Sequence, residues 1–163
     1  MTEKRKDYSR AAGAAALGAR LRRLSERLDR ETAEIYVAQG IRFEQRWFGV
    51  LNQIVLNGPM TVGDIAEALC ITHVSVSQAR RALESAGLIQ MAGDKADARR
   101  RLISLSAQGD ALVAALAPLW AALSESAKEL DAEAGHLVPL LDRLEDALDA
   151  RALSDRVAAR LGV

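Results

Sequence analysis

Apolar residues recur near the start of the chain at the three- and four-residue spacings of amphipathic helices. The first apolar stripe begins at Leu17 and extends to Ile35, and Gly40 is placed to end that helix. A second segment with helical spacing covers 46–56, and the turn-forming residues at 57–59 close it. The N-terminal part of the chain is therefore predicted to contain two helices.

Two shorter helices joined by a tight turn are predicted next. Thr61 and Asp64 have the spacing of a capping box, in which each side chain bonds the backbone amide of the other residue. Thr72 is placed as the N-cap of the second short helix, and Gly87 is placed just beyond its end. The turn between the two helices lies near Cys70 and is very short.

The pattern changes to that of a β-hairpin after this helix pair. Residues 88–91 and 101–105 are strand candidates, and a charged, turn-prone segment separates them. Ser106 can cap the helix that follows. The predicted C-terminal helices carry two apolar stripes, made of Leu112, Leu116, Leu119, Trp120, Leu123, Ala127 and Leu130, then Leu137, Leu140, Leu141, Leu144 and Leu148, with a short further helix from Leu153 to Leu161.

These elements predict a mainly α-helical chain with a small β-hairpin wing, which is the arrangement of a winged helix-turn-helix. The predicted organisation is a flexible N-terminal arm over 1–16 and a winged helix-turn-helix over 46–106. A helical region, made of 17–45 and 107–163, flanks it on both sides.

Composition supports a helical protein, because half of the 163 residues are hydrophobic while only 4% are aromatic. The net charge is zero, but the charges are unevenly distributed. Residues 72–101 hold six Lys and Arg against three Asp and Glu, whereas residues 107–163 hold five against ten. A polyanionic partner is therefore expected to bind the middle of the chain.

Several classes of protein are disfavoured by the sequence. The apolar runs are too short to span a bilayer, and one cysteine is typical of a reducing cytoplasm, so a cytoplasmic location is predicted. We find no phosphate-binding loop, nucleophile elbow or catalytic cluster, and expect neither enzymatic activity nor a cofactor. His73 and His136 are too few and too far apart to predict a metal site.

The second short helix has a polar face suited to the major groove of DNA. Short hydroxyl side chains allow the backbone to approach, and longer donors can reach base edges. No acidic residue occurs from Thr72 to Arg81. The DNA contacts predicted on this helix are Thr72, His73, Ser75, Ser77, Gln78 and Arg81. The alternative is an ordinary solvated helix face, which the basic hairpin nearby makes less favoured.

The segment TVGDIAEALCITHVSVSQARRALESAGLI, followed by DARRRLISLSAQG, resembles the DNA-binding core of the MarR family of regulators. The shared features are the tight helix-turn-helix, Asp97-Ala98-Arg99 in the wing, and the Leu-Ser-x-x-Gly sequence from Leu105 to Gly109. The flanking helices extend the resemblance to roughly 17–148. Met91 departs from the family, whose members often carry arginine there.

The resemblance implies roles for the wing residues. Arg99 would enter the minor groove, and Asp97 would hold it in position by an ion pair. Lys95, Arg100 and Arg101 are candidates for contacts with the DNA backbone. Arg101 fits equally well as an outward-facing strand residue.

The resemblance also implies a homodimer on an inverted-repeat DNA site, usually acting as a repressor. The leucine stripes agree with this, because there are more of them than one small core needs. Family members commonly respond to a small aromatic or anionic molecule. The residues predicted to bind such an effector are Arg42, Phe43, Arg46, Trp47 and Trp120, with Phe48 nearby. The alternative for these aromatics is a place in the core.

Two further alternatives stay open at this stage. Cys70 is expected to be a buried structural cysteine, because the end of an apolar helix normally packs inside, although a thiol switch is the other interpretation. The whole chain could also be a winged-helix adaptor that binds proteins instead of DNA. Arg80, Arg81 and the basic hairpin favour DNA.

Overall fold

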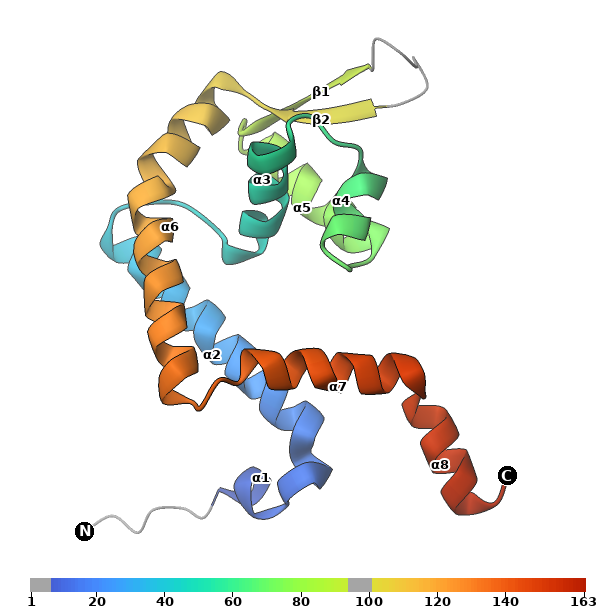
Figure 1. Cartoon of the computed structure of the whole chain (residues 1–163). Helices are drawn as coiled ribbons and strands as arrows, with labels where there is room; N and C mark the ends of the chain where they lie inside the picture. The colour runs from blue at the N-terminus through green and yellow to red at the C-terminus, as the bar shows by residue number, and fades with distance from the viewer. Residues whose placement is uncertain (1–6, 94–100) are drawn as a thin grey trace, which may run out of the picture. The chain divides into compact units, whose positions relative to one another are not determined.

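A computed structural model describes residues 7–93 and 101–163 (Figure 1). The chain forms two structural units, residues 1–110 and residues 111–163, and each is described by itself. The first unit contains α1 (Tyr8–Ala11), the 3₁₀ helix η1 (Gly13–Ala16), α2 (Leu17–Ala38), α3 (Gln45–Asn57), α4 (Val62–Ala68), α5 (His73–Ser85), β1 (Ile89–Gly93) and β2 (Arg101–Leu105). Helix α6 (Ala107–Glu133) begins in the first unit and continues into the second, which also holds α7 (Val138–Ala150) and α8 (Leu153–Leu161).

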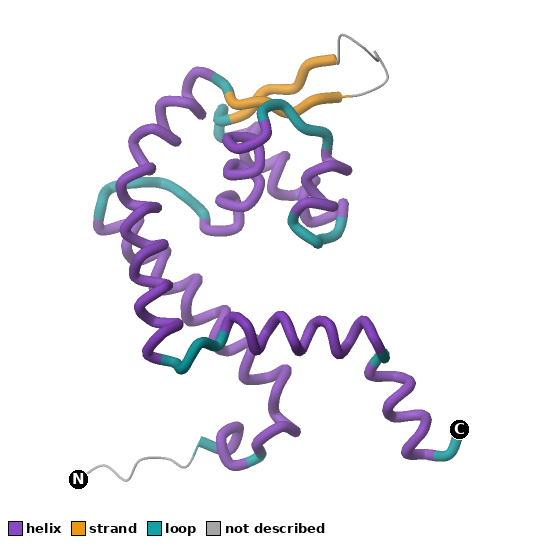
Figure 2. The backbone as a smooth tube through the Cα atoms, in the orientation of Figure 1, coloured by secondary structure: helices purple, strands orange, loops and turns teal. Residues whose placement is uncertain are grey.

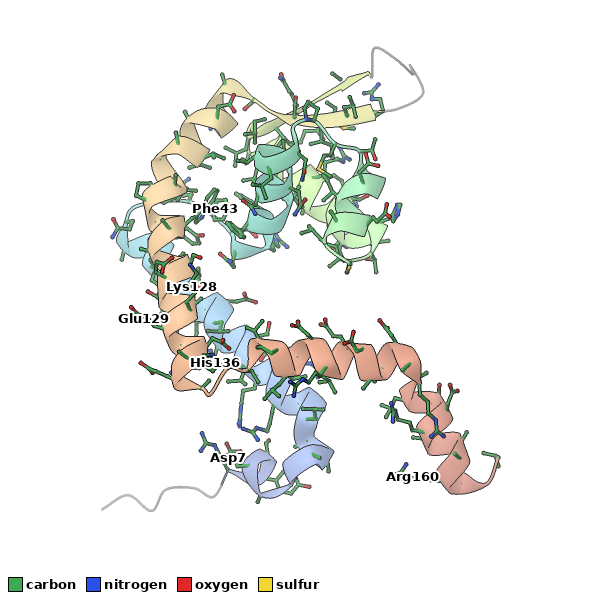
Figure 3. All side chains as sticks on the ribbon, viewed as in Figure 1. Asp7, Phe43, Lys128, Glu129, His136 and Arg160 are labelled. Carbon is green, nitrogen blue, oxygen red and sulfur yellow. The ribbon has the colours of Figure 1, made fainter. Side chains whose placement is uncertain are left out.

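Part of the predicted N-terminal arm is helical. Residues 1–6 lie outside the described residues, but residues 8–16 form α1 and η1. Asp7, labelled in Figure 3, caps α1 by accepting from the Ser9 amide at 3.0 Å. Arg23 of α2 donates to both Asp7 carboxylate oxygens, at 3.2 and 2.9 Å. The hydrogen bond from Arg23 lowers the pKa of Asp7 below its usual value.

The long helix α2 ends where the sequence predicts. The Ile41 amide bonds the Tyr36 carbonyl and the Gly40 amide bonds the Val37 carbonyl, both at 2.9 Å. This is a Schellman turn, which needs a left-handed residue at Gly40. Gly40 has φ of 69°, which glycine adopts without the steric cost of a Cβ atom.

Helices α3, α4 and α5 pack together beside the β-hairpin, as Figures 1 and 2 show. Each contributes an apolar face at helical spacing, so the cluster forms a core between them. The capping box of α4 is present, with the Asp64 amide bonding Thr61 Oγ1 and the Thr61 amide bonding Asp64 Oδ2, both at 3.1 Å. The buried core residues of these elements are Val50, Leu51, Ile54, Ile65, Ala66, Val76, Ala79, Leu83, Leu88, Ile89 and Ile103.

The hairpin strands are antiparallel, with Ile89 opposite Leu105 and Gly93 opposite Arg101. A bridge to the segment before α4 attaches the hairpin to the helices. Met60 and Ile103 exchange two backbone hydrogen bonds, at 3.1 and 2.8 Å. This bridge was not predicted from the sequence, and it holds the base of the wing against the helix-turn-helix.

The start of α6 is joined closely to the end of α5. Ser106 Oγ donates to the Gly87 carbonyl at 2.6 Å and accepts from the Gly109 amide at 3.0 Å, so the predicted cap is present. The Ser106 amide also bonds the Leu88 carbonyl at 3.1 Å. A Cβ atom at Gly109 would collide with the Leu88 carbonyl oxygen, so only glycine fits at this position.

The second unit consists of helices with largely uncovered apolar side chains. Helix α6 contains Pro118 in its interior and ends in a left-handed turn at Gly135 and His136. The Val138 amide then bonds Asp131 Oδ1 at 2.9 Å, which fixes the start of α7 to the end of α6. The exposed apolar side chains here are Leu130, Leu137, Val138, Leu140, Leu148, Leu153, Val157, Leu161 and Val163.

Candidate nucleic-acid interface

The start of α5 is fixed by its predicted cap. Thr72 Oγ1 accepts from the Ser75 amide at 3.1 Å and lies 2.9 Å from Ser75 Oγ. Both side chains are exposed, so their hydroxyl groups remain accessible from outside the helix. An N-cap side chain such as that of Thr72 accepts a hydrogen bond from an amide of the first turn that has no partner within the helix.

The turn between α4 and α5 is another Schellman turn, with cysteine in place of glycine. The Ile71 amide bonds the Ala66 carbonyl at 3.0 Å, and Cys70 has φ of 51°. Cys70 is a free, exposed thiol whose Sγ lies 3.7 Å from the Glu67 carbonyl oxygen. The expectation of a buried cysteine is therefore wrong. Cys70 has a left-handed backbone conformation, so its side chain does not continue the apolar face of α4 that points into the core.

The outward face of α5 carries the predicted base-reading side chains. At about 100° per residue, the positions opposite the buried Val76, Ala79 and Leu83 are 74, 77, 78 and 81. Gln78 and Arg81 are exposed there, and Ser77 is half-buried beside them. His73 is exposed at the first turn, where its ring lies near Gly63 of α4.

Val74 was not among the side chains predicted to contact DNA. It lies at the centre of this outward face and is 63% exposed. Its position could have been derived from the sequence, since a residue two places before the buried Val76 is turned by about 160° from it. Polar residue type alone was too narrow a criterion for the face.

Arg80 is directed away from this face. Its Nη1 bonds Glu84 Oε2 at 2.6 Å and approaches Met91 Sδ of β1 at 3.0 Å. Only 20% of its side chain is exposed. Arg80 therefore ties α5 to the hairpin, and Arg81 is the one of the two arginines that is exposed on the outward face.

The predicted contacts Lys95, Asp97, Arg99 and Arg100 lie outside the described residues. Arg101 is the first residue of β2 and is exposed, which leaves both of its predicted interpretations open.

A cavity of about 320 Å³ lies beside α5, between that helix, α3 and the end of α4. It brings together one residue predicted to bind an effector, Arg46, and two predicted to contact DNA, Ser75 and Gln78. Arg46 is paired with Glu44 at 2.6 Å, which offsets its positive charge. The lining residues are Arg46, Gly49, Val50, Leu69, Ile71, Ser75, Gln78 and Ala79.

The predicted effector aromatics lie elsewhere. Phe43, labelled in Figure 3, packs between Tyr36 at 4.9 Å and Trp47 at 5.8 Å between ring centroids. All three are buried, and the Trp47 indole N–H is buried without a hydrogen-bond partner among the described residues. Arg42 is exposed nearby, whereas Trp120 is half-buried in α6, in the other unit.

A model of the MarR family matches residues 40–100, which cover α3, α4, α5 and β1. This similarity covers less than half of the chain. The resemblance noted in the sequence is thereby confirmed for the segment that carries the helix-turn-helix. No curated protein was found to match the chain.

Solved structures of MarR-family and related regulators share the fold over most of the chain. A probable transcriptional regulator from Pseudomonas aeruginosa is 26% identical, with 78% of this chain and 96% of that chain covered and a TM-score of 0.61. BpsR of Bordetella bronchiseptica, whose DNA binding is regulated by 6-hydroxynicotinic acid, is 25% identical, with 79% and 92% covered and a TM-score of 0.65. MepR of S. aureus, in complex with DNA, is 22% identical, with 80% and 97% covered and a TM-score of 0.67.

These matches confirm the predicted fold class, a mainly α-helical winged helix-turn-helix. The chain is thus similar to the MarR family over residues 40–100 and to a probable transcriptional regulator over most of its length. Within residues 7–93 and 101–163, no helix is long and apolar enough to cross a membrane. The same described residues include no cluster of His, Cys, Asp and Glu that could hold a metal ion.

Proposed function

We propose that the chain binds double-stranded DNA sequence-specifically, as a homodimer on an inverted repeat, and represses transcription from that site. The observation that carries this proposal is the outward face of α5. Gln78 and Arg81 are exposed on it beside the hydroxyl groups of Thr72 and Ser75. An amide and a guanidinium are the groups that read adenine and guanine edges in the major groove.

Electrostatics support the same face as the DNA contact. The first acidic residue of α5 is Glu84, and its carboxylate is already paired with Arg80. Phosphate groups near the exposed part of α5 would therefore meet no unpaired carboxylate of that helix. The predicted wing contacts, led by Arg99, would add positive charge on the neighbouring minor groove.

The homodimer is supported by uncovered leucines in both structural units. Leu24 and Leu28 of α2 are exposed, as are Leu140 and Leu148 of α7. Burying one leucine side chain is worth about 1.5–3 kcal/mol, so several of them together favour association. A two-fold dimer of helix-turn-helix proteins places its recognition helices roughly 34 Å apart, which requires two half-sites in inverted orientation.

We also propose that a small anionic molecule releases the DNA. The support is the likeness to BpsR, whose DNA binding is regulated by 6-hydroxynicotinic acid. Arg42 and Arg46 remain the proposed carboxylate partners, with Phe43 and Trp47 as the proposed aromatic lining. Adding a small aromatic acid to the protein–DNA complex should lower the fluorescence anisotropy of labelled DNA.

Fluorescence anisotropy tests the central proposal directly. The labelled duplexes are the DNA upstream of the protein's own gene and a scrambled sequence, each measured across a salt series. The expected result is submicromolar binding to the upstream DNA and much weaker binding to the scramble. Equal, weak and strongly salt-dependent binding to both would leave only phosphate attraction and would favour the protein-binding adaptor.

The variants separate base reading from backbone contact. Gln78→Ala should reduce the preference for the specific duplex more than the affinity for the scramble, because it removes a base-edge contact. Arg99→Ala should weaken binding by about 1–3 kcal/mol. An unchanged affinity of the Arg99 variant would contradict the proposed role of the wing.

A further inference from the structure

The outward face of α5 is polar except at one position. We propose that Val74 reads the C5 methyl group of a thymine in the major groove, next to the base pair that Gln78 contacts. In α5, Val74 would then select an A·T base pair through an apolar contact, while Gln78 would select a nearby base pair through hydrogen bonds. This inference rests on the proposed DNA-binding function and adds a specificity-determining residue to it.

The placement of Val74 comes from its exposure and helical phase. Val74 is 63% exposed, whereas Val76, two residues later on the same helix, is completely buried. Val74, Gln78 and Arg81 follow one another at spacings of four and three residues, so they share one line along the helix. Val74 therefore stands in the row of side chains that faces the DNA in the proposed complex.

Helix stability gives no reason for valine at this position. A β-branched side chain on an exposed helix position has a lower helix propensity than alanine, and an exposed valine buries little surface within the chain. Binding to DNA would bury it. Among the four bases only thymine presents a methyl group in the major groove, and apolar side chains recognise thymine through it.

The neighbouring side chains suit such a contact. Valine is short, so the helix backbone must approach the bases closely, and the small residues Ser75 and Ser77 on either side permit this approach. Val74 and Gln78 are four residues apart, which is about 6 Å along the helix axis. Because successive bases on a strand are about 3.4 Å apart, the two side chains would read positions one or two base pairs apart.

The experiment begins by selecting the DNA sequences that the protein binds. The full-length chain is used to enrich duplexes from a random library, and the enriched half-site is then made with each thymine replaced singly by deoxyuridine. Deoxyuridine pairs as thymine does but has no C5 methyl group. Binding is measured by fluorescence anisotropy for the wild-type protein, for Val74→Ala, and for Val55→Ala as a matched control. Val55 is also an exposed valine, 44% accessible, but it lies on α3.

The expected result is a weaker binding of the wild-type protein at one thymine position of the half-site. The loss should be about fourfold for one methyl group, and about fifteenfold when both half-sites are substituted. Val74→Ala should bind the thymine duplex with a similar loss and should no longer distinguish it from the deoxyuridine duplex. Val55→Ala should behave as the wild type, and circular dichroism should show both variants folded.

Three other results would overturn the inference. If no thymine position affects binding, or if Val74→Ala distinguishes the two duplexes as strongly as the wild type does, Val74 does not read a methyl group. In both cases the enriched half-site still supports the proposed DNA-binding function. If no sequence is enriched at all, the proposed function fails and this inference fails with it.

Discussion

The winged-helix elements and the last two helices, α7 and α8, carry the same kind of apolar stripe, but only the winged-helix stripes are buried within one chain. In α3, α4 and α5, Leu51, Ile65 and Leu83 are completely buried. In α7 and α8, Leu140 is 51% exposed and Leu153 is 65% exposed. Helical spacing predicts that a stripe will be buried, but it does not say whether the covering surface belongs to the same chain.

The difference indicates that the two regions depend on different conditions. The core of the winged helix is buried by residues of the same chain, so its stability should not depend on protein concentration. The leucine stripes of α7 and α8 gain their hydrophobic stabilisation only when a second surface covers them. Substitutions that remove one leucine from each region can test this distinction.

The largest effect is expected at Leu140. Leu140→Ala removes an apolar side chain from both copies of a dimer, so the association free energy should weaken by about 3–6 kcal/mol per dimer, at about 1.5–3 for each leucine. Sedimentation velocity over a concentration series measures the shift. Unchanged association would place the dimer contact elsewhere and remove α7 from it.

Leu83→Ala should destabilise the winged helix itself. Leu83 is completely buried in α5, and removing a buried leucine side chain costs about 2–5 kcal/mol, because a cavity remains. Urea unfolding followed by circular dichroism measures this change. If this loss of unfolding free energy depended strongly on protein concentration, the winged helix would not be stabilised by its own chain alone, and the proposed difference between the two regions would be wrong.

Gly109→Ala should cost about 1–3 kcal/mol of unfolding free energy, because the new Cβ would collide with the Leu88 carbonyl oxygen. Gly18→Ala is the matched control, since no atom lies within 4 Å of a Cβ built at that helical position. The control should be neutral or more stable by up to about 1 kcal/mol. Equal effects of the two substitutions would argue against the close approach.

The smallest effect is expected at the capping box of α4. Thr61→Ala removes the acceptor for the Asp64 amide and should cost about 1 kcal/mol. Hydrogen exchange should show faster exchange of the first amides of α4 and little change in α7. Loss of protection throughout the chain would mean that the two regions unfold as one.

The parts of the fold that could be predicted depend on neighbours in sequence. Thr61, Thr72 and Gly87 each act on a backbone group within a few residues, so the ends of α4 and α5 follow from residue type. Met60 could not be predicted in this way, because its bridge to Ile103 joins segments more than forty positions apart.

The candidate site shows the same division. Gln78 and Arg81 were predicted correctly to be exposed, since helical phase alone places them opposite the core. Arg80 lies away from that face, and its contact with Met91 could not be predicted because the two residues lie on different elements. Cys70 was misjudged because its left-handed backbone breaks the phase on which the prediction of burial depended.

The junction from Gly87 to Gly109 has a consequence for protein engineering. Ser106 donates a hydrogen bond to the Gly87 carbonyl in the turn after α5, and Gly109 has no Cβ atom to collide with the Leu88 carbonyl oxygen. The residues before and after the hairpin are therefore in direct contact. A chimera that receives α5 from a relative should keep this junction from a single parent. Exchange of α5 up to Ser85 would change the DNA sequence that the protein recognises and keep this junction intact. A crossover point between Gly87 and Gly109 would instead take the two sides of the junction from different parents, so their contacts would no longer match.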